Sequence, residues 1–183
     1  MPSPFADGQR LHGTERPLLD TARIVRDGAL LSVAGSTYLV LLLRFNCRIF
    51  LRHYPKELRK IVPPKSKHEM QMSVLLGVPF ALMLLGAPYV STRLWQTTSQ
   101  GSSSFWELFA HAFGVFFLFN LVDLLVIDWL IVCWYAPSWV ILPGTEHIVP
   151  TKPYLHHFKG FLIGTASSVF VGFAIAALLN GQF

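Results

Sequence analysis

The residues best suited to chemistry are the polar side chains that interrupt one long apolar stretch, between Phe105 and Ala136. An ionised side chain such as Asp costs roughly 2.5–3.5 kcal/mol at the centre of a membrane helix. Such groups are therefore rare in membrane spans and are the first candidates for a functional role. The stretch contains Glu107, His111, Asn120, Asp123 and Asp128.

The segment that follows this stretch adds acids and histidines close to one of its ends. They lie in the sequences PGTEH and YLHHFKG. A carboxylate beside a histidine forms proton relays, general acid–base pairs and metal sites. We expect the inner acids of the stretch to gather with these residues near the cytoplasmic membrane surface. The candidate catalytic residues are Asp123, Asp128, Glu146, His147, His156 and His157.

On a straight α-helix these groups cannot all face one point, because successive residues turn by about 100°. Asn120 and Asp123 share a face that points away from His111, and Asp128 lies about 140° from Asp123. Two separate polar groups are therefore predicted, one toward each end of the helix.

The outer group consists of Glu107 and His111, four residues apart on one face. We take them as candidate metal ligands or as an ion pair at the outer boundary. In the inner group, His156 and His157 are adjacent and point about 100° apart on a helix, so one of the two is expected to reach the acids.

Three arginines follow the first apolar stretch at intervals of four residues: Arg44, Arg48 and Arg52. This spacing predicts a helix that continues out of the membrane with the arginines along one side, as far as Pro55. Long arginine side chains at this height reach lipid phosphates. The predicted ligand-binding residues are these arginines together with Asn120 and Asp123.

No established catalytic motif accompanies these residues. The chain has no HxxxH or HxxHH boxes, no GxSxG nucleophile turn, no P-loop and no GxGxxG sequence. The reaction and any cofactor therefore stay open.

The composition shows what must position these groups. Of the 183 residues 52% are apolar and only 14% are charged, whereas soluble domains are about one-quarter charged. Runs of about 20 apolar residues cross a bilayer, and four occur, at 28–45, 73–94, 105–136 and 160–179. The third is longer than a perpendicular crossing needs, so it must tilt, kink or protrude. We predict a single all-α membrane domain over 1–183: a four-transmembrane-helix bundle with a short juxtamembrane amphipathic extension.

The basic residues predict the orientation, because short loops rich in Lys and Arg stay in the cytoplasm. Eight of the fifteen bases flank or lie in the loop 46–69: Arg44, Arg48, Arg52, Lys56, Arg59, Lys60, Lys65 and Lys67. The loops 46–69 and 137–159 are then cytoplasmic, and the tail 1–27 and the C-terminus lie outside the cell membrane. The net charge of +5 indicates anionic lipid headgroups as partners and not nucleic acid.

Small residues recur every four positions in the fourth stretch, at Gly160, Gly164, Ser168, Gly172 and Ala176, and in the first, at Gly28, Ser32 and Ser36. Such rows let membrane helices approach closely. The first and fourth helices are expected to cross, within one chain or between two copies.

Three functions fit these observations. The first is a ligand-, proton- or ion-handling bundle that acts as an oligomer, because four spans rarely form a pathway alone. The second is a membrane enzyme that acts on a lipid or another amphipathic substrate at the cytoplasmic face through the Asp/Glu/His cluster. The third is an accessory or assembly subunit of a larger membrane complex.

Overall fold

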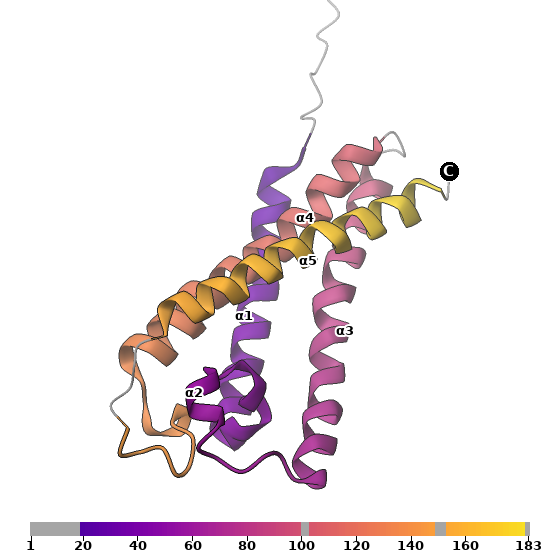
Figure 1. Ribbon diagram of the computed structural model, residues 1–183. Coiled ribbons are helices and arrows are strands. Elements are labelled where there is room, and N and C mark those ends of the chain that lie inside the picture. The colour runs from indigo at the N-terminus through magenta and orange to yellow at the C-terminus, as the bar shows by residue number, and fades with distance from the viewer. Residues whose placement is uncertain (1–18, 100–102, 149–152, 182–183) are drawn as a thin grey trace, which may run out of the picture.

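The computed structural model describes residues 19–99, 103–148 and 153–181, and within these ranges it is helical with no strand (Figure 1). Residues 1–18 of the predicted tail and 149–152 of the predicted second loop lie outside the described residues. Four helices are long and apolar enough to cross a membrane: Thr21–His53, Lys67–Thr98, Phe105–Tyr135 and Tyr154–Asn180. The all-helical class and the four long apolar helices are thus as predicted.

These four helices contain several shorter elements. In chain order the elements are α1 (Thr21–Asn46), the 3₁₀ helix η1 (Cys47–His53), α2 (Lys56–Arg59), α3 (Lys67–Thr98), α4 (Phe105–Val122), the π-helix η2 (Asp123–Tyr135), the 3₁₀ turn η3 (Ser138–Val140) and α5 (Tyr154–Asn180).

Polar caps set the starts of three helices. The Asp20 side chain accepts a hydrogen bond from the Arg23 backbone N–H at 2.9 Å and starts α1. Capping boxes start α3, with Ser66, and α4, with Ser104. Caps of this kind satisfy backbone N–H groups that have no partner within the helix. Because they lie outside the apolar runs, α1 and α3 begin well before the predicted spans.

The predicted extension of the first helix is not one continuous helix. The Asn46 backbone is extended, and its side chain accepts a hydrogen bond from the Arg48 N–H at 2.9 Å, which starts η1 as a separate turn. The sequence spacing predicted Arg44, Arg48 and Arg52 along one side of a single helix. Arg44 lies on α1 and the other two lie on η1, so the three are not aligned in this way. The turn ends at His53, before Pro55, which agrees with the predicted stop.

Helix α4 lies at the centre of the bundle, and both small-residue rows pack against it and not on each other. A Cβ atom at Gly28 would lie 2.8 Å from Leu118, and one at Gly164 would lie 2.1 Å from Oδ1 of Asn120. Ser168 and Ala176 of α5 are fully buried. The expected crossing of the first and fourth helices is thus replaced by two crossings on α4 within one chain.

The two halves of the bundle differ in packing. One half contains the start of α1 and the end of α5. There the helices enclose two apolar clusters, one around Leu31 and Val115 and the other around Leu108 and Ala176. In the other half, α3 and α5 diverge (Figure 1). The loop segments between α1 and α3 and between η2 and α5 lie at this open end.

The contact between Gly164 and Asn120 gives a stability prediction. Gly164→Val places methyl groups where Asn120 lies, and overpacking of this kind costs about 1–3 kcal/mol. The midpoint temperature of unfolding in detergent should fall clearly. Gly160→Val is the matched control, because nothing lies within 4 Å of a Cβ at Gly160. Equal midpoints for the two variants would contradict this packing.

Candidate functional site

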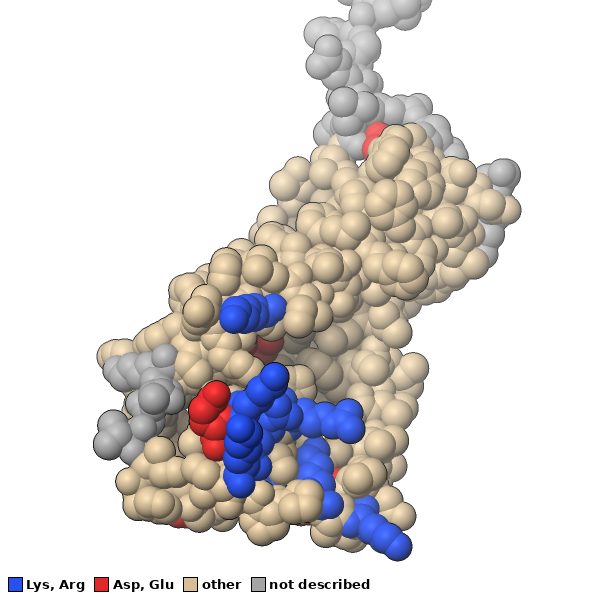
Figure 2. Space-filling model, in the orientation of Figure 1, with Lys and Arg blue, Asp and Glu red and all other residues tan. Residues whose placement is uncertain are grey.

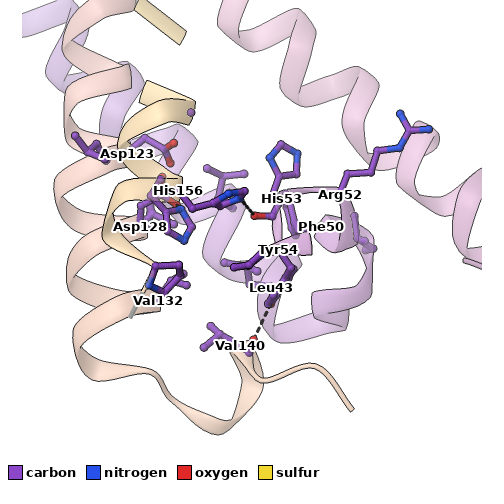
Figure 3. Close-up of a pocket in the computed structure, with 18 of the residues that line it drawn as sticks. Leu43, Phe50, Arg52, His53, Tyr54, Asp123, Asp128, Val132, Val140 and His156 are labelled. Atoms are coloured by element: carbon purple, nitrogen blue, oxygen red, sulfur yellow. Dashed lines mark hydrogen bonds and ion pairs between the residues drawn. The ribbon is translucent and has the colours of Figure 1, made fainter. Parts of the chain in front are cut away.

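A cavity of about 890 Å³ occupies the open half of the bundle. Its walls come from the ends of α1, α3, α4 and α5 that face the loops, together with η1 and η2 (Figure 3). Ligand pockets ordinarily measure roughly 300–1,000 Å³, so the cavity has the size of a binding site.

The cavity lining is graded from apolar to charged. Its deepest residues are apolar, among them Leu39, Leu84 and Phe116. Nearer the loops lie Asn120 and all the acidic, basic and histidine side chains of the lining: Asp123, Asp128, His53, His156, His157, Arg52, Lys159 and Glu146. This gradient matches a molecule with an apolar chain and a polar head.

Asp128 and His157 form a hydrogen-bonded pair in the cavity wall. His157 Nδ1 lies 2.8 Å from Asp128 Oδ1, and the two side chains are 11% and 24% exposed. When Nδ1 donates to the carboxylate, Nε2 carries the lone pair of the neutral ring. The pair can therefore accept a proton at Nε2 while the carboxylate holds the ring in place and balances its charge.

The π-helix explains how Asp123 and Asp128 both reach the cavity. Backbone bonds in a π-helix run between residues five apart, and η2 ends with such a bond, from Ala136 N–H to the Ile131 carbonyl at 2.8 Å. Residues five apart therefore lie on the same side of the helix, much closer in direction than in an α-helix. The separation of about 140° given by a straight α-helix therefore does not apply in η2, and both acids of the expected inner group line the cavity.

Asp123 and Asn120 differ in their partners. The Asn120 side-chain amide donates to the Phe161 carbonyl at 3.0 Å and lies 3.1 Å from Thr165 Oγ1, which ties α4 to α5. Asp123 lies one turn further along and points into the cavity in Figure 3. Its Oδ1 atom is buried and has no hydrogen-bond partner among the described residues.

Both adjacent histidines line the cavity, and one of them, His157, reaches an acid, as expected. The His156 ring does not meet the acids. Its Nε2 lies 2.8 Å from the His53 carbonyl oxygen, and the His156 and His157 rings stand nearly perpendicular, at 84°. His156 therefore joins α5 to η1 across the mouth of the cavity (Figure 3).

The predicted PGTEH residues lie at the rim. The Glu146 carboxylate accepts the Gly144 N–H, at 2.9 and 3.0 Å, in a tight turn where Gly144 has φ +90°. Hydrogen bonds to backbone N–H groups lower the pKa of Glu146. Glu146 lines the cavity, whereas His147 is exposed and lies outside the lining.

The three predicted ligand-binding arginines have three different surroundings. Arg48 is held by Glu69, with 2.5 Å between Nε and Oε1, and donates to the Pro63 carbonyl at 3.1 Å. Arg44 lies over the Trp139 ring, 5.8 Å from its centroid. Of the three, Arg52 is the one that lines the cavity.

Arg52 is exposed and forms no ion pair within the described residues. Burial and the charge of Arg52 lower the pKa of Lys65, which donates to Ser73 in the cavity wall at 2.7 Å. Lys159 lines the cavity from α5. The cavity lining therefore carries one cation from η1 and one from α5.

Glu107 and His111 do not come together. Glu107 caps α4, accepting the Ser104 N–H at 2.6 Å, and His111 is fully buried beneath Trp95, with ring centroids 4.9 Å apart. His111 Nε2 lies 2.9 Å from Ser91 Oγ, which donates to Asp27. Because the hydroxyl hydrogen is used there, His111 must donate at Nε2. The predicted ion pair is wrong, and no group of three or more metal-ligating side chains occurs among the described residues.

Lys159 and His53 are lining residues that the sequence reasoning did not select. Lys159 follows His157 by two residues in the predicted loop 137–159. Comparisons with family models, curated proteins and solved structures found no match for this chain.

The different surroundings of Arg48 and Arg52 give a second prediction. Arg48→Gln leaves Glu69 without its ion pair and releases the 46–66 segment, so the free energy of unfolding should fall by about 1–3 kcal/mol. Arg52→Gln should change it by less than about 0.5 kcal/mol. Thermal unfolding of the two variants in the same detergent measures the difference, and a larger loss with Arg52→Gln would contradict these assignments.

Proposed function

We propose that this protein is a multi-pass membrane enzyme that binds an amphipathic substrate in the cavity and exchanges a proton with it through His157, held by Asp128. The observation that carries the proposal is the 2.8 Å contact between Asp128 and His157 in the wall of a large cavity. A histidine oriented by a carboxylate is a common general acid–base.

The extent of the cavity favours an enzyme over a pathway across the membrane. Lining residues are confined to the loop-facing halves of the helices, such as 39–43 of α1 and 116–120 of α4. The other halves are filled by the apolar clusters around Val115 and Leu108. A site that opens at one end suits a bound substrate and does not suit passage through one chain.

The oligomer predicted from the sequence followed from the pathway alternative, and it stays a prediction.

Charge favours an anionic headgroup as the polar end of the substrate. Arg52 of η1 and Lys159 of α5 both line the cavity, and two of its three acids are engaged, Asp128 by His157 and Glu146 by Gly144. On the face in Figure 2, Lys and Arg side chains gather around the hollow. A phosphate or carboxylate at the rim would meet these cations while its chain lies among the apolar residues.

The same charges support the orientation. The basic segment between α1 and α3 lies at the open end of the bundle, and basic loops stay in the cytoplasm. The proposed enzyme lies in the cell membrane with its cavity open to the cytoplasmic face and both termini outside.

Cysteine labelling tests this orientation. Glu57→Cys, in α2, and Thr97→Cys, near the end of α3, are both exposed positions, and the native Cys47 and Cys133 are buried. A membrane-impermeant maleimide should label Thr97→Cys in intact cells and label Glu57→Cys only after permeabilisation. The reverse pattern would overturn the proposed orientation.

Substitution of the pair tests the activity. Wild-type protein is reconstituted in vesicles of phosphatidylethanolamine and phosphatidylglycerol that contain phosphatidic and lysophosphatidic acid, and lipids are followed over time by mass spectrometry. We expect one or more lipid species to be converted. His157→Gln should slow conversion by roughly 10²–10⁴-fold, and Asp128→Asn by at least about tenfold, because Asp128 orients the ring.

His147→Gln is the matched control, since His147 lies outside the cavity lining, and its rate should equal that of the wild type. Absence of any conversion by the wild type, or an undiminished rate in His157→Gln, would refute the proposed function.

A further inference from the structure

Asp123 is the one acid of the inner group whose partner is missing. Its Oδ1 atom is buried without a hydrogen bond among the described residues, while Asp128 is paired with His157. Buried polar atoms in native structures are nearly always hydrogen-bonded, so an exception calls for a partner that the protein itself does not supply.

No described residue donates a hydrogen bond to this atom. The Asn120 amide is already committed to the Phe161 carbonyl and Thr165. The other lining residues beside Asp123 on the same helix, Leu124 and Ile127, are apolar. Asp123 lines the cavity, so the cavity is the place from which a donor can approach its carboxylate.

The position of Asp123 limits what that donor is. Figure 3 shows the Asp123 carboxylate on the same side of the cavity as Asp128, further from the η3 turn and its Val140. The apolar interior lies beyond it, around Leu39 and Phe116. A molecule with its anionic group at Arg52 and its chain in this interior places the atoms between head and chain beside Asp123.

A hydroxyl group fits this position better than an ammonium group. An ammonium headgroup is repelled by Arg52 and Lys159 at the rim, and burying its charge among apolar side chains is costly. A hydroxyl has no charge to desolvate, donates one hydrogen bond and offers lone pairs to a second group.

We propose that the cavity is specific for an anionic amphiphile that carries a free hydroxyl between its headgroup and its chain, and that Asp123 accepts the hydrogen bond of this hydroxyl. Lysophospholipids have this order of groups. This inference rests on the proposed function, which makes the cavity a substrate site, and it names the class of that substrate. Asp123 is the residue that hydrogen-bonds the hydroxyl and places it near the Asp128–His157 pair.

The test compares two probes that differ in one hydrogen-bond donor. Oleoyl lysophosphatidic acid has a free hydroxyl on the central glycerol carbon, and its 2-O-methyl ether has none. Binding to the full chain in nanodiscs is measured by titration calorimetry. The wild type should bind the alcohol about 10- to 100-fold more tightly than the ether, because the ether leaves Asp123 unpaired.

Asp123→Leu should reduce this ratio to about one while it still binds the ether. Asp123→Ala gives the same readout without filling the cavity. Glu146→Leu is the matched control: it removes an acid at the rim whose carboxylate already accepts a backbone N–H, and it should keep the wild-type ratio.

Equal wild-type affinities for the two probes would overturn the inference, since water would then serve as the partner of Asp123. An unchanged ratio in Asp123→Leu and Asp123→Ala, or no binding of either probe, would overturn it as well. The proposed function fails separately, through undiminished turnover in His157→Gln, and that result leaves the selectivity of binding for the hydroxyl unaffected.

Discussion

The contact of Asn120 with α5 is the interaction on which the cavity depends. Lipid exerts no hydrophobic force between membrane helices, so they associate through close packing and interhelical hydrogen bonds. Asn120 supplies both, because it fits against Gly164 and donates to the Phe161 carbonyl. On one side of this contact the helices pack around buried apolar clusters; on the other, α5 departs from α3 and the cavity opens.

The change from α- to π-helix follows directly after this contact, at Asp123. A π-segment loosens the coil by one residue per hydrogen-bonded turn and is often found at functional sites. Here it turns Asp128 to the side of Asp123 and lets it meet His157 on α5. The same residues in an α-helix would direct the two carboxylates about 140° apart. The local helix type, and not the spacing alone, therefore creates the acid–histidine pair.

The sequence predicts features that depend on local patterns. The third stretch, expected at 105–136, is the helix Phe105–Tyr135, because its apolar residues far outnumber the polar side chains within it. Asp123, Asp128 and His157 were candidates because ionisable groups stand out in such a setting. The sequence does not predict that Arg48 forms an ion pair with Glu69, or that Asp128 pairs with His157 in particular. These pairs join distant segments, and their formation depends on η1 and η2, whose unusual backbone leaves no periodic signal.

Asp123 and Asp128, two acids of the cavity lining, differ in whether the protein supplies a hydrogen-bond partner, and this difference separates a structural role from a role in ligand recognition. Asp128 has a partner within the protein, so its charge is balanced by His157. Asp123 has none, so the protein keeps a buried acceptor whose hydrogen-bonding capacity is unused. A ligand without a hydrogen-bond donor at that depth leaves the acceptor unpaired and binds more weakly, whereas a ligand with a donor there binds more tightly. Selectivity of the site thus arises from the unsatisfied group, and reactivity from the satisfied pair beside it.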